Sequence, residues 1–232
     1  MTRTELLKTA KPILFNTDMV RAILDGRKTV TRRVLNNQDK HSYAFSWEID
    51  ELGKPFVDLF CNDNGEKYLL GNKANYGAGD ILYVRETWCW CPCWDCGQDT
   101  PAGCIDPYAR ITFDDNKGEW GCIGYKASFA ENEHPPGLET WKPSIHMPKE
   151  AARIFLRVTD VRVEQLQEIN ADGIRNEGLT SMAVHVGDME IAQAEFALLW
   201  DSTVKKSDLE RYGWAANPWV WVIEFERVEV QE

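Results

Sequence analysis

One short segment combines a hydroxyl with four cations, and this combination has a definite chemistry. Arg27, Lys28, Arg32 and Arg33 fall within seven positions of a chain whose formal net charge is -11, and Thr31 lies among them. A lysine can remove a proton from a hydroxyl when burial or a second cation lowers its pKa, and the arginines supply such neighbours. The segment therefore indicates a site for an anionic or polar partner; the alternative is a solvated turn after a helix.

A second group of reactive side chains is formed by cysteines. Cys93 and Cys96 have the Cys-x-x-Cys spacing of half a zinc site. Cys104 and Cys122 supply two further thiolates, and Cys91 is a substitute for one of them. Since closed thiolate sites are structural, we expect a structural zinc and no cofactor for chemistry. The alternative is a set of reduced thiols.

The Lys28 segment must be positioned by the elements around it. The pattern predicts a helix over residues 17–25, capped by Thr17 and ended by Gly26, followed by an extended strand. Further strands are expected over residues 81–88 and 152–166, and from Trp219 onward.

Two later segments have helical patterns. Asn170 precedes a short helix over residues 171–176, and a longer helix is expected over residues 189–202. On the longer helix, the 3.6-residue period places four residues on the inner face. These are Ile191, Ala194, Leu198 and Leu199.

The order of these elements predicts a mostly β fold with short helices, of the α+β class. No βαβ rhythm is present, which favours a small, mostly antiparallel β-barrel or a strongly bent sheet over a parallel sheet. We expect a single domain over residues 1–232 with two inserted segments: a probable hairpin at 36–78 and a Cys- and Trp-rich segment at 89–141.

Composition excludes several classes of function. A net charge of -11 argues against extended duplex nucleic acid as a partner, because that needs a broad basic surface. It leaves room for one nucleotide or a short RNA segment in a local basic cleft. No apolar run approaches the length of a membrane span, and the N-terminus lacks an apolar signal core. We therefore expect a cytoplasmic protein without a membrane partner.

Several local motifs, taken in order, resemble one family. They are Gly26–Arg32, Gly79–Arg85, Asn176–Leu179 and the closing Trp221–Phe225 strand. Together they resemble the ASCH domain, a relative of the PUA RNA-binding barrel. The additional segments Tyr83–Trp88, Lys142–Pro148 and Asn217–Trp221 look like those of the larger ASCH proteins found in phages and prophages.

The resemblance implies recognition of a nucleotide, a modified nucleoside or a short RNA segment in a barrel cleft. A small bacterial branch of the family is an amidohydrolase that removes the acetyl group from N4-acetylcytidine, using a Lys-x-x-Thr pair and a later Glu. The matching residues are Lys28 as base, Thr31 as nucleophile and Glu177 as the group that orients the lysine or shuttles a proton. The chain is therefore a candidate amidohydrolase.

Other side chains are expected to bind the ligand in the same cleft. They are Arg32, Arg33, Arg85, Glu86, Trp88, Ser144 and His146. For Arg85, Glu86 and His146, the alternative is a structural ion pair or hydrogen bond. A second hypothesis for the whole chain is a phage-derived protein-interaction module without catalysis, whose Cys- and Trp-rich segment binds a host protein.

Overall fold

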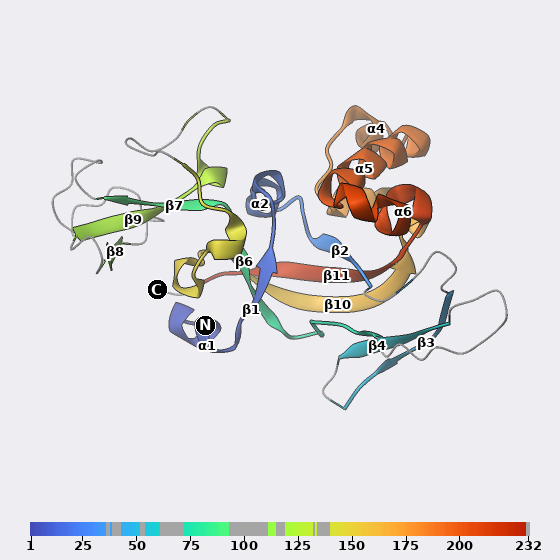
Figure 1. Ribbon diagram of the computed structural model, residues 1–232, viewed down its shortest axis with the longest axis horizontal. Coiled ribbons are helices and arrows are strands. Elements are labelled where there is room, and N and C mark those ends of the chain that lie inside the picture. The colour runs from blue at the N-terminus through green and yellow to red at the C-terminus, as the bar shows by residue number, and fades with distance from the viewer. Residues whose placement is uncertain are drawn as a thin grey trace. The chain divides into compact units, whose positions relative to one another are not determined.

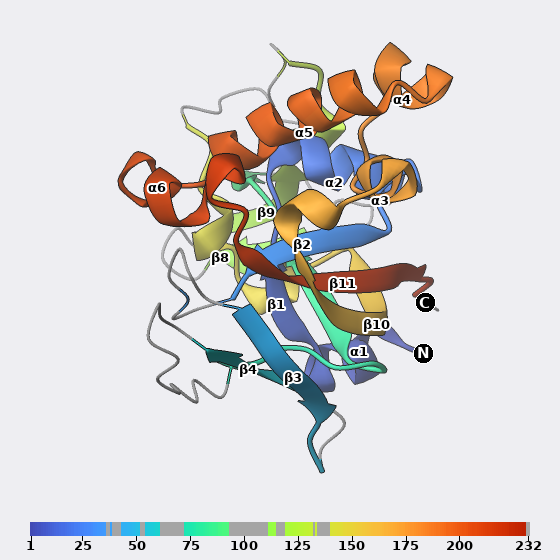
Figure 2. The same ribbon diagram turned by 90° about the vertical axis from the view of Figure 1, so that its right-hand side faces the viewer.

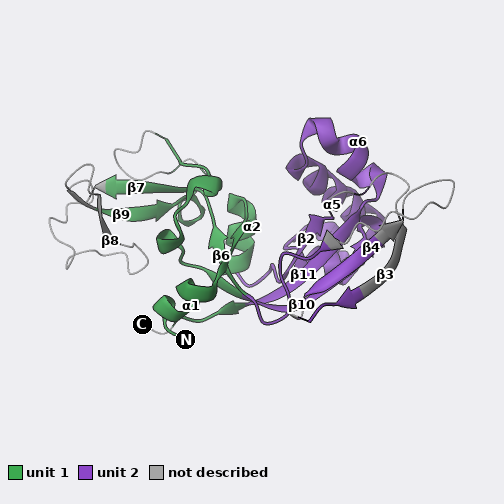
Figure 3. Ribbon diagram, turned by 60° about the horizontal axis from the view of Figure 1, so that its bottom comes forward, with its two compact units in different colours: residues 1–24, 81–156, 227–232 green, residues 25–80, 157–226 purple. Residues whose placement is uncertain are grey.

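The structure, a computed structural model, divides into two compact units that are described separately (Figure 3). Unit 1 comprises residues 1–24, 81–156 and 227–232, and unit 2 comprises residues 25–80 and 157–226. The described residues are 1–35, 38, 43–51, 54–60, 72–92, 111–114, 119–131, 133 and 140–230.

The largest sheet has five strands (Figure 1). In spatial order they are β1 (Lys11–Leu14), β6 (Ile81–Arg85), β10 (Phe155–Gln165), β11 (Trp219–Val228) and β2 (Val30–Val34). β1 and β6 pair in parallel within unit 1, and β11 and β2 pair antiparallel within unit 2.

The fold is mixed α/β, with this sheet and short helices. A closed barrel requires hydrogen bonds between the first and last strands of the order. Among the described strands, the order ends at β1 on one side and β2 on the other, so the sheet is open and does not form the closed barrel expected from the sequence.

Two smaller sheets are antiparallel. In unit 2, β3 (Tyr43–Ile49) pairs with β4 (Pro55–Phe60), which pairs with β5 (Asn72–Lys73). In unit 1 the order is β7 (Trp88–Pro92), β9 (Glu119–Tyr125), β8 (Ile111–Asp114). These sheets lie largely within segments 36–78 and 89–141, whose assignment as insertions into a single domain stays a prediction.

The apolar core of unit 2 lies between its sheet and a group of helices (Figure 2). The helices that contribute buried residues are α3 (Ala171–Asn176), α4 (Met182–Val186) and α5 (Met189–Thr203), and α6 (Leu209–Tyr212) follows α5 along the chain. Val30, Val220 and Val222 point from β2 and β11 into this core. Their alternation along the strands leaves the intervening residues on the opposite face.

Capping residues fix the limits of these helices. The Asn170 side chain accepts a hydrogen bond from Gly173 N at the start of α3, and Asp188 does the same for Ile191 N at the start of α5. Gly187 follows α4 with a left-handed φ of 78°, a conformation that glycine adopts without strain.

Unit 1 has its own core. It includes Leu6 of α1 (Arg3–Thr9), Tyr83 of β6 and Met147. α2 (Thr17–Leu24) is tied to the chain after β9 because Arg21 donates to the carbonyls of Ala127 and Phe129. Among the described helices of the chain, none is long and apolar enough to cross a membrane.

Short 3-10 helices connect the larger elements. They are η3 (Lys126–Ser128), η4 (Ser144–His146), η5 (Lys149–Ala151), η6 (Leu166–Glu168), η7 (Lys206–Asp208) and η8 (Trp214–Ala216).

Candidate functional site

The backbone just before β2 is fixed from two sides. Gly26, with a left-handed φ of 73°, ends the turn after α2 as the sequence predicts. Thr29 N donates to the Asn176 carbonyl at the end of α3, and the Thr29 carbonyl accepts from Phe225 N of β11. These bonds place Lys28 beside the C-terminal end of α3.

Lys28 is buried and paired with Glu177. Its Nζ donates to the Glu177 carboxylate and, at 3.0 Å, to the Glu177 carbonyl oxygen. Lys28 is only 2% exposed, and this burial lowers the pKa of its ammonium group. Glu177 offsets part of that effect, whereas Arg33 and Arg32 add to it. The predicted base therefore contacts the predicted acidic group.

The second carboxylate oxygen of Glu177 accepts from Arg32. Arg32 Nη1 lies 3.2 Å from Glu177 Oε1, and Nη2 lies 3.2 Å from Glu164 Oε2. Arg32 is buried, so its charge is balanced by two carboxylates rather than by solvent. Its Nε is buried without a hydrogen-bond partner among the described residues.

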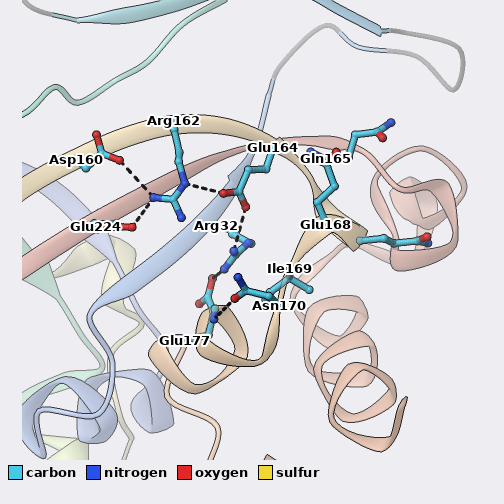
Figure 4. A network of polar contacts seen from close by, with 12 residues as sticks. Arg32, Asp160, Arg162, Glu164, Gln165, Glu168, Ile169, Asn170, Glu177 and Glu224 are labelled. Atoms are coloured by element: carbon cyan, nitrogen blue, oxygen red, sulfur yellow. Dashed lines mark hydrogen bonds and ion pairs between the residues drawn. The ribbon is translucent and has the colours of Figure 1, made fainter. Parts of the chain in front are cut away.

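The ion pairs continue along β10 and across to β11 (Figure 4). Arg162 Nε donates to Glu164 Oε1 at 2.6 Å, and its Nη1 contacts Asp160 at 3.3 Å and Glu224. The network therefore joins β2, β10, β11 and the residue after α3. It orients Arg32, which in turn holds Glu177.

A glycine makes room for this network. A Cβ on Gly173 would lie 2.9 Å from Ile169 Cγ1 and 3.1 Å from Arg32 Nη2. A side chain at this position would therefore displace the Ile169 and Arg32 side chains, and glycine lets α3 approach the arginine without that displacement.

A cavity of about 190 Å³ adjoins the network. Pockets for drug-sized ligands are commonly about 300–1,000 Å³, so this one suits a smaller group. Its lining is polar and rich in carboxylates, which disfavours an anionic group. The charged lining residues are Arg32, Arg162, Glu164, Glu168, Asp172 and Glu224.

Thr31 and Arg33 point to the opposite face of β2. They pair with Ile223 and Trp221 of β11, whereas Arg32 pairs with Val222 of the helix-covered face. Thr31 is 1% exposed. Burial lowers the pKa of Arg33, and both Glu177 and Tyr76 raise it.

A second, smaller pocket of about 50 Å³ lies on the Thr31 face. Its lining combines cations, an amide and aromatic rings, without a carboxylate among the described lining residues. The residues concerned are Arg33, Lys73, Asn75, Tyr76, Trp221 and Ile223. The two sides of β2 therefore differ sharply in charge.

Arg85 and Glu86 lie in unit 1 and have structural partners. Arg85 donates to the carbonyls of Met147, at 3.1 Å, and Ile145. Glu86 receives two bonds from Arg153, at 2.8 and 2.9 Å. Burial raises the pKa of the Glu86 carboxyl, and Arg153 offsets part of that rise. The alternative interpretation, a structural ion pair, accounts for the contacts of Glu86.

The other expected ligand-binding residues of unit 1 are Trp88, Ser144 and His146. Trp88 is buried, with Lys142 Nζ 4.9 Å from the centre of its ring. Because it is buried, Trp88 is not part of an exposed aromatic surface for a protein partner. Ser144 and His146 belong to η4, and His146 is exposed.

The expected zinc ligands are only partly within the described structure. Cys93, Cys96 and Cys104 lie outside the described residues. Cys91 of β7 pairs in register with Cys122 of β9, and Cys89 Sγ lies 3.4 Å from Cys91 Sγ. Among the described residues, no group of three or more His, Cys, Asp or Glu side chains is arranged to hold a metal ion. The zinc site therefore stays a prediction.

Sequence reasoning missed the partners that surround the predicted residues. Arg162 and Glu164 alternate with Val161 and Val163 along β10, a pattern that marks a strand with one charged face. That pattern could have shown that β10 carries charges to one side. It could not have shown that Arg32 and Glu224 meet them there.

No described protein family matches the chain, and no curated protein or solved structure is significantly similar to it.

Proposed function

We propose that unit 2 recognises a nucleoside-type ligand at β2: a modified nucleoside, a nucleotide or a short RNA segment. The main observation that supports this proposal is that Lys28 and Arg32 contact Glu177 directly, while Arg33 interacts with it electrostatically. In a chain with a net charge of -11, this places a concentrated group of cations beside one strand. The motifs that resemble an ASCH domain, with its PUA-like fold, support the same proposal.

The two faces of β2 have different roles in the proposed recognition. Arg32 is paired through both Nη atoms with carboxylates and acts as a positioning residue for Glu177. Arg33 and Trp221 lie on the Thr31 face, where cations and aromatic rings are suited to nucleotides. We therefore place the ligand on the Thr31 face.

The buried Lys28–Glu177 pair favours a second activity, hydrolysis of an N4-acylated cytidine. Lys28, once deprotonated, takes the proton of the Thr31 hydroxyl while Thr31 Oγ forms a bond to the acyl carbon. The C–N bond then breaks, and the amine leaves with the proton from Lys28. Water hydrolyses the resulting ester and releases the carboxylic acid. Because Lys28 and Thr31 are buried, the substrate reaches them only after a local opening.

Binding is tested by calorimetry and thermal denaturation with cytidine, N4-acetylcytidine and their nucleotides. We expect saturable binding of at least one probe and a higher melting temperature in its presence. The exposed variant Glu226→Gln is the control and should bind equally well, because Glu226 forms a surface ion pair with Arg157. Absence of binding for every probe would contradict the proposal.

Hydrolysis is tested separately by measuring cytidine release. Thr31→Val keeps the shape but removes the oxygen, and Lys28→Arg keeps the charge but does not give up its proton at ordinary pH. Both should abolish turnover and leave binding within a modest factor. A fully active Lys28→Arg variant would exclude the lysine as base. No turnover by the wild type on any acylated cytidine would limit the function to binding.

A further inference from the structure

The ion pairs around Glu177 form a series of alternating charges that begins at the buried Lys28. Glu177 accepts from Lys28 with one carboxylate oxygen and from Arg32 with the other. Arg32 also donates to Glu164 Oε2 through Nη2, and Glu164 accepts from Arg162 Nε with Oε1 (Figure 4). Positive and negative groups therefore alternate over these five side chains, which we call the charge series.

The exposure of these side chains increases from one end of the charge series to the other. The side chains of Lys28 and Arg32 are 0% and 2% exposed, whereas those of Glu164 and Arg162 are 22% and 37% exposed. Glu164 and Arg162 also line the cavity of about 190 Å³. The inner members therefore interact with little screening by solvent, and the outer members lie at the wall of the cavity.

Arg32 is shared between two carboxylates. Its Nη1 and Nη2 atoms lie at the same distance, 3.2 Å, from Glu177 and from Glu164. The negative charge of Glu164 attracts Arg32 and so weakens the attraction of Arg32 for Glu177. Without that charge, Arg32 would depend more on Glu177 and would compete with Lys28 for it.

The proton affinity of Lys28 depends on this competition. Burial lowers the pKa of Lys28, Glu177 raises it, and Arg33 and Arg32 lower it. Glu164 acts on this balance in two ways that have the same sign. Its negative charge favours the ammonium form, and its contact with Arg32 weakens the competitor for Glu177. Loss of the Glu164 charge should therefore make the Lys28 ammonium a stronger acid.

We propose that Glu164 is a positioning residue for Lys28: it holds Arg32 toward β10 and thereby keeps Glu177 available to the lysine. The inference rests on the proposed role of Lys28 as the base and deepens it, because it names a residue that controls when this base carries a proton. It also connects the two faces of β2, since Glu164 lines the cavity on the Arg32 face and Thr31 lies on the other face.

The test is an NMR titration of the lysine ¹³Cε resonances, in which Lys28 is the signal missing from Lys28→Arg. In Glu164→Gln, which keeps the shape but removes the charge, the acid dissociation constant of Lys28 should rise by about threefold or more. In Arg162→Gln it should fall, because a cation is lost and Glu164 is left to Arg32. Glu226→Gln removes a surface carboxylate paired with Arg157 and is the matched control, with a smaller change expected.

The alternation of charges makes these variants suitable for the test. Removal of the Glu164 charge leaves Arg32 with Glu177 and Arg162 with Glu224. Removal of Arg162 leaves Glu164 with Arg32. Each buried member of the charge series therefore keeps an opposite charge, so we expect both variants to fold. Circular dichroism defines the pH range in which each protein is folded, and the titration is confined to that range.

A purely structural role for Glu164 would give a different result. Loosening of the site would let water reach Lys28 and would raise its pKa toward the ordinary value of 10.5 in both variants. A lower pKa in Glu164→Gln supports positioning, and an unchanged or higher pKa in the folded variant overturns it. If Glu164→Gln does not fold, Arg162→Gln decides, and an unchanged or lower pKa of Lys28 there overturns the proposal.

The outcomes also separate this inference from the function on which it rests. The titration needs no ligand, so it remains decisive if none of the nucleoside probes binds. If the wild type hydrolyses N4-acetylcytidine, the acid limb of its kcat profile should move to lower pH in Glu164→Gln, in step with the pKa of Lys28. An unmoved profile beside a shifted pKa would contradict Lys28 as the base and leave the positioning by Glu164 in place.

Discussion

At the scale of single residues, Glu177 is the centre of charge in the candidate site. It joins Lys28, Arg32 and, electrostatically, Arg33, and it follows directly after α3. The backbone bonds of Thr29 to Asn176 and Phe225, and the bond from Arg27 to the Gly178 carbonyl, bring this residue to a lysine 149 positions earlier in the chain. The Lys28–Glu177 contact is thus a property of the tertiary fold.

Replacing Glu177 tests how much this pairing stabilises the protein. Glu177→Gln leaves the buried Lys28 without its carboxylate, and breaking a buried pair in this way costs about 3–5 kcal/mol. We expect a corresponding fall in the free energy of unfolding, measured by urea denaturation. Glu226→Gln breaks the exposed pair with Arg157 and should cost less than about 1 kcal/mol. Equal costs for the two variants would mean that the buried pair adds little.

The lowered pKa of Lys28 predicts a definite pH dependence of stability. Between its folded pKa and the ordinary value of 10.5, the folded state binds fewer protons than the unfolded state at this lysine. The contribution of Lys28 to stability therefore rises with pH through this window. Lys28→Met removes the titration, so the difference in unfolding free energy between wild type and variant should change with pH there. A constant difference would show that the folded pKa is not lowered.

At the scale of elements, α5 shows where a periodic pattern misleads. The predicted inner face, with Ile191, Ala194, Leu198 and Leu199, is wrong: Ile191 is 51% exposed and Leu198 74% exposed. The buried stripe is Ala192, Phe196 and Trp200. The aromatic rings orient α5 toward the core. The ring centroid of Phe196 lies 6.4 Å from that of Trp200 and 5.9 Å from that of Trp214.

This orientation can be measured with two substitutions on one helix. Phe196→Ala should lower the free energy of unfolding by about 3–5 kcal/mol, because it opens a cavity in the core of unit 2. Leu198→Ala, at an exposed position, should change it by less than about 0.5 kcal/mol. Urea midpoints of the two variants give the comparison, and a reversed order would restore the face expected from the sequence.

Local sequence signals predicted where helices begin and end better than they predicted which side chains contact one another. Gly26 ends the turn after α2 and Asn170 caps α3 as expected, since both effects depend on a few neighbouring residues. The predicted cap of α2 was wrong, because Asn16 Oδ1 rather than Thr17 accepts from Met19 N. The Arg32–Glu164 and Arg162–Glu224 contacts join distant segments, and no local pattern specifies them.

At the scale of the whole molecule, an open sheet and a closed barrel built from these strands differ in one strand pairing, the one between the first and last strands of the order. The described strands agree with the expected sheet and short helices, but β1 and β2 remain at the two ends of the order. Barrel closure depends on the tilt and stagger of every strand at once. A pattern of separated apolar strands therefore predicts a sheet and cannot decide whether it closes.

The zinc hypothesis concerns how a long segment of the chain is held together, because all of its expected ligands lie within residues 89–141. Protein purified without added zinc should contain about one zinc per chain by elemental analysis, since closed thiolate sites retain their metal. Cys122→Ser should lower this content, whereas Cys61→Ser, outside the 89–122 group, should not. A metal-free, folded protein with freely titrating thiols would contradict the hypothesis.

Because Arg32 and Arg33 lie on opposite faces of β2, the number of residues in this segment matters as well as their charge. Because a strand alternates its sides, inserting one residue between Thr29 and Val30 would move every following side chain to the other side of the sheet. Thr31 would then take the place of Arg32 beside the carboxylates, and the charged Arg33 would take the place of Val34 against the helix core. Such an insertion would leave the residue types of the segment in place but move each of them to the opposite face of the sheet. The spacing of this segment is therefore as constrained as its residue types.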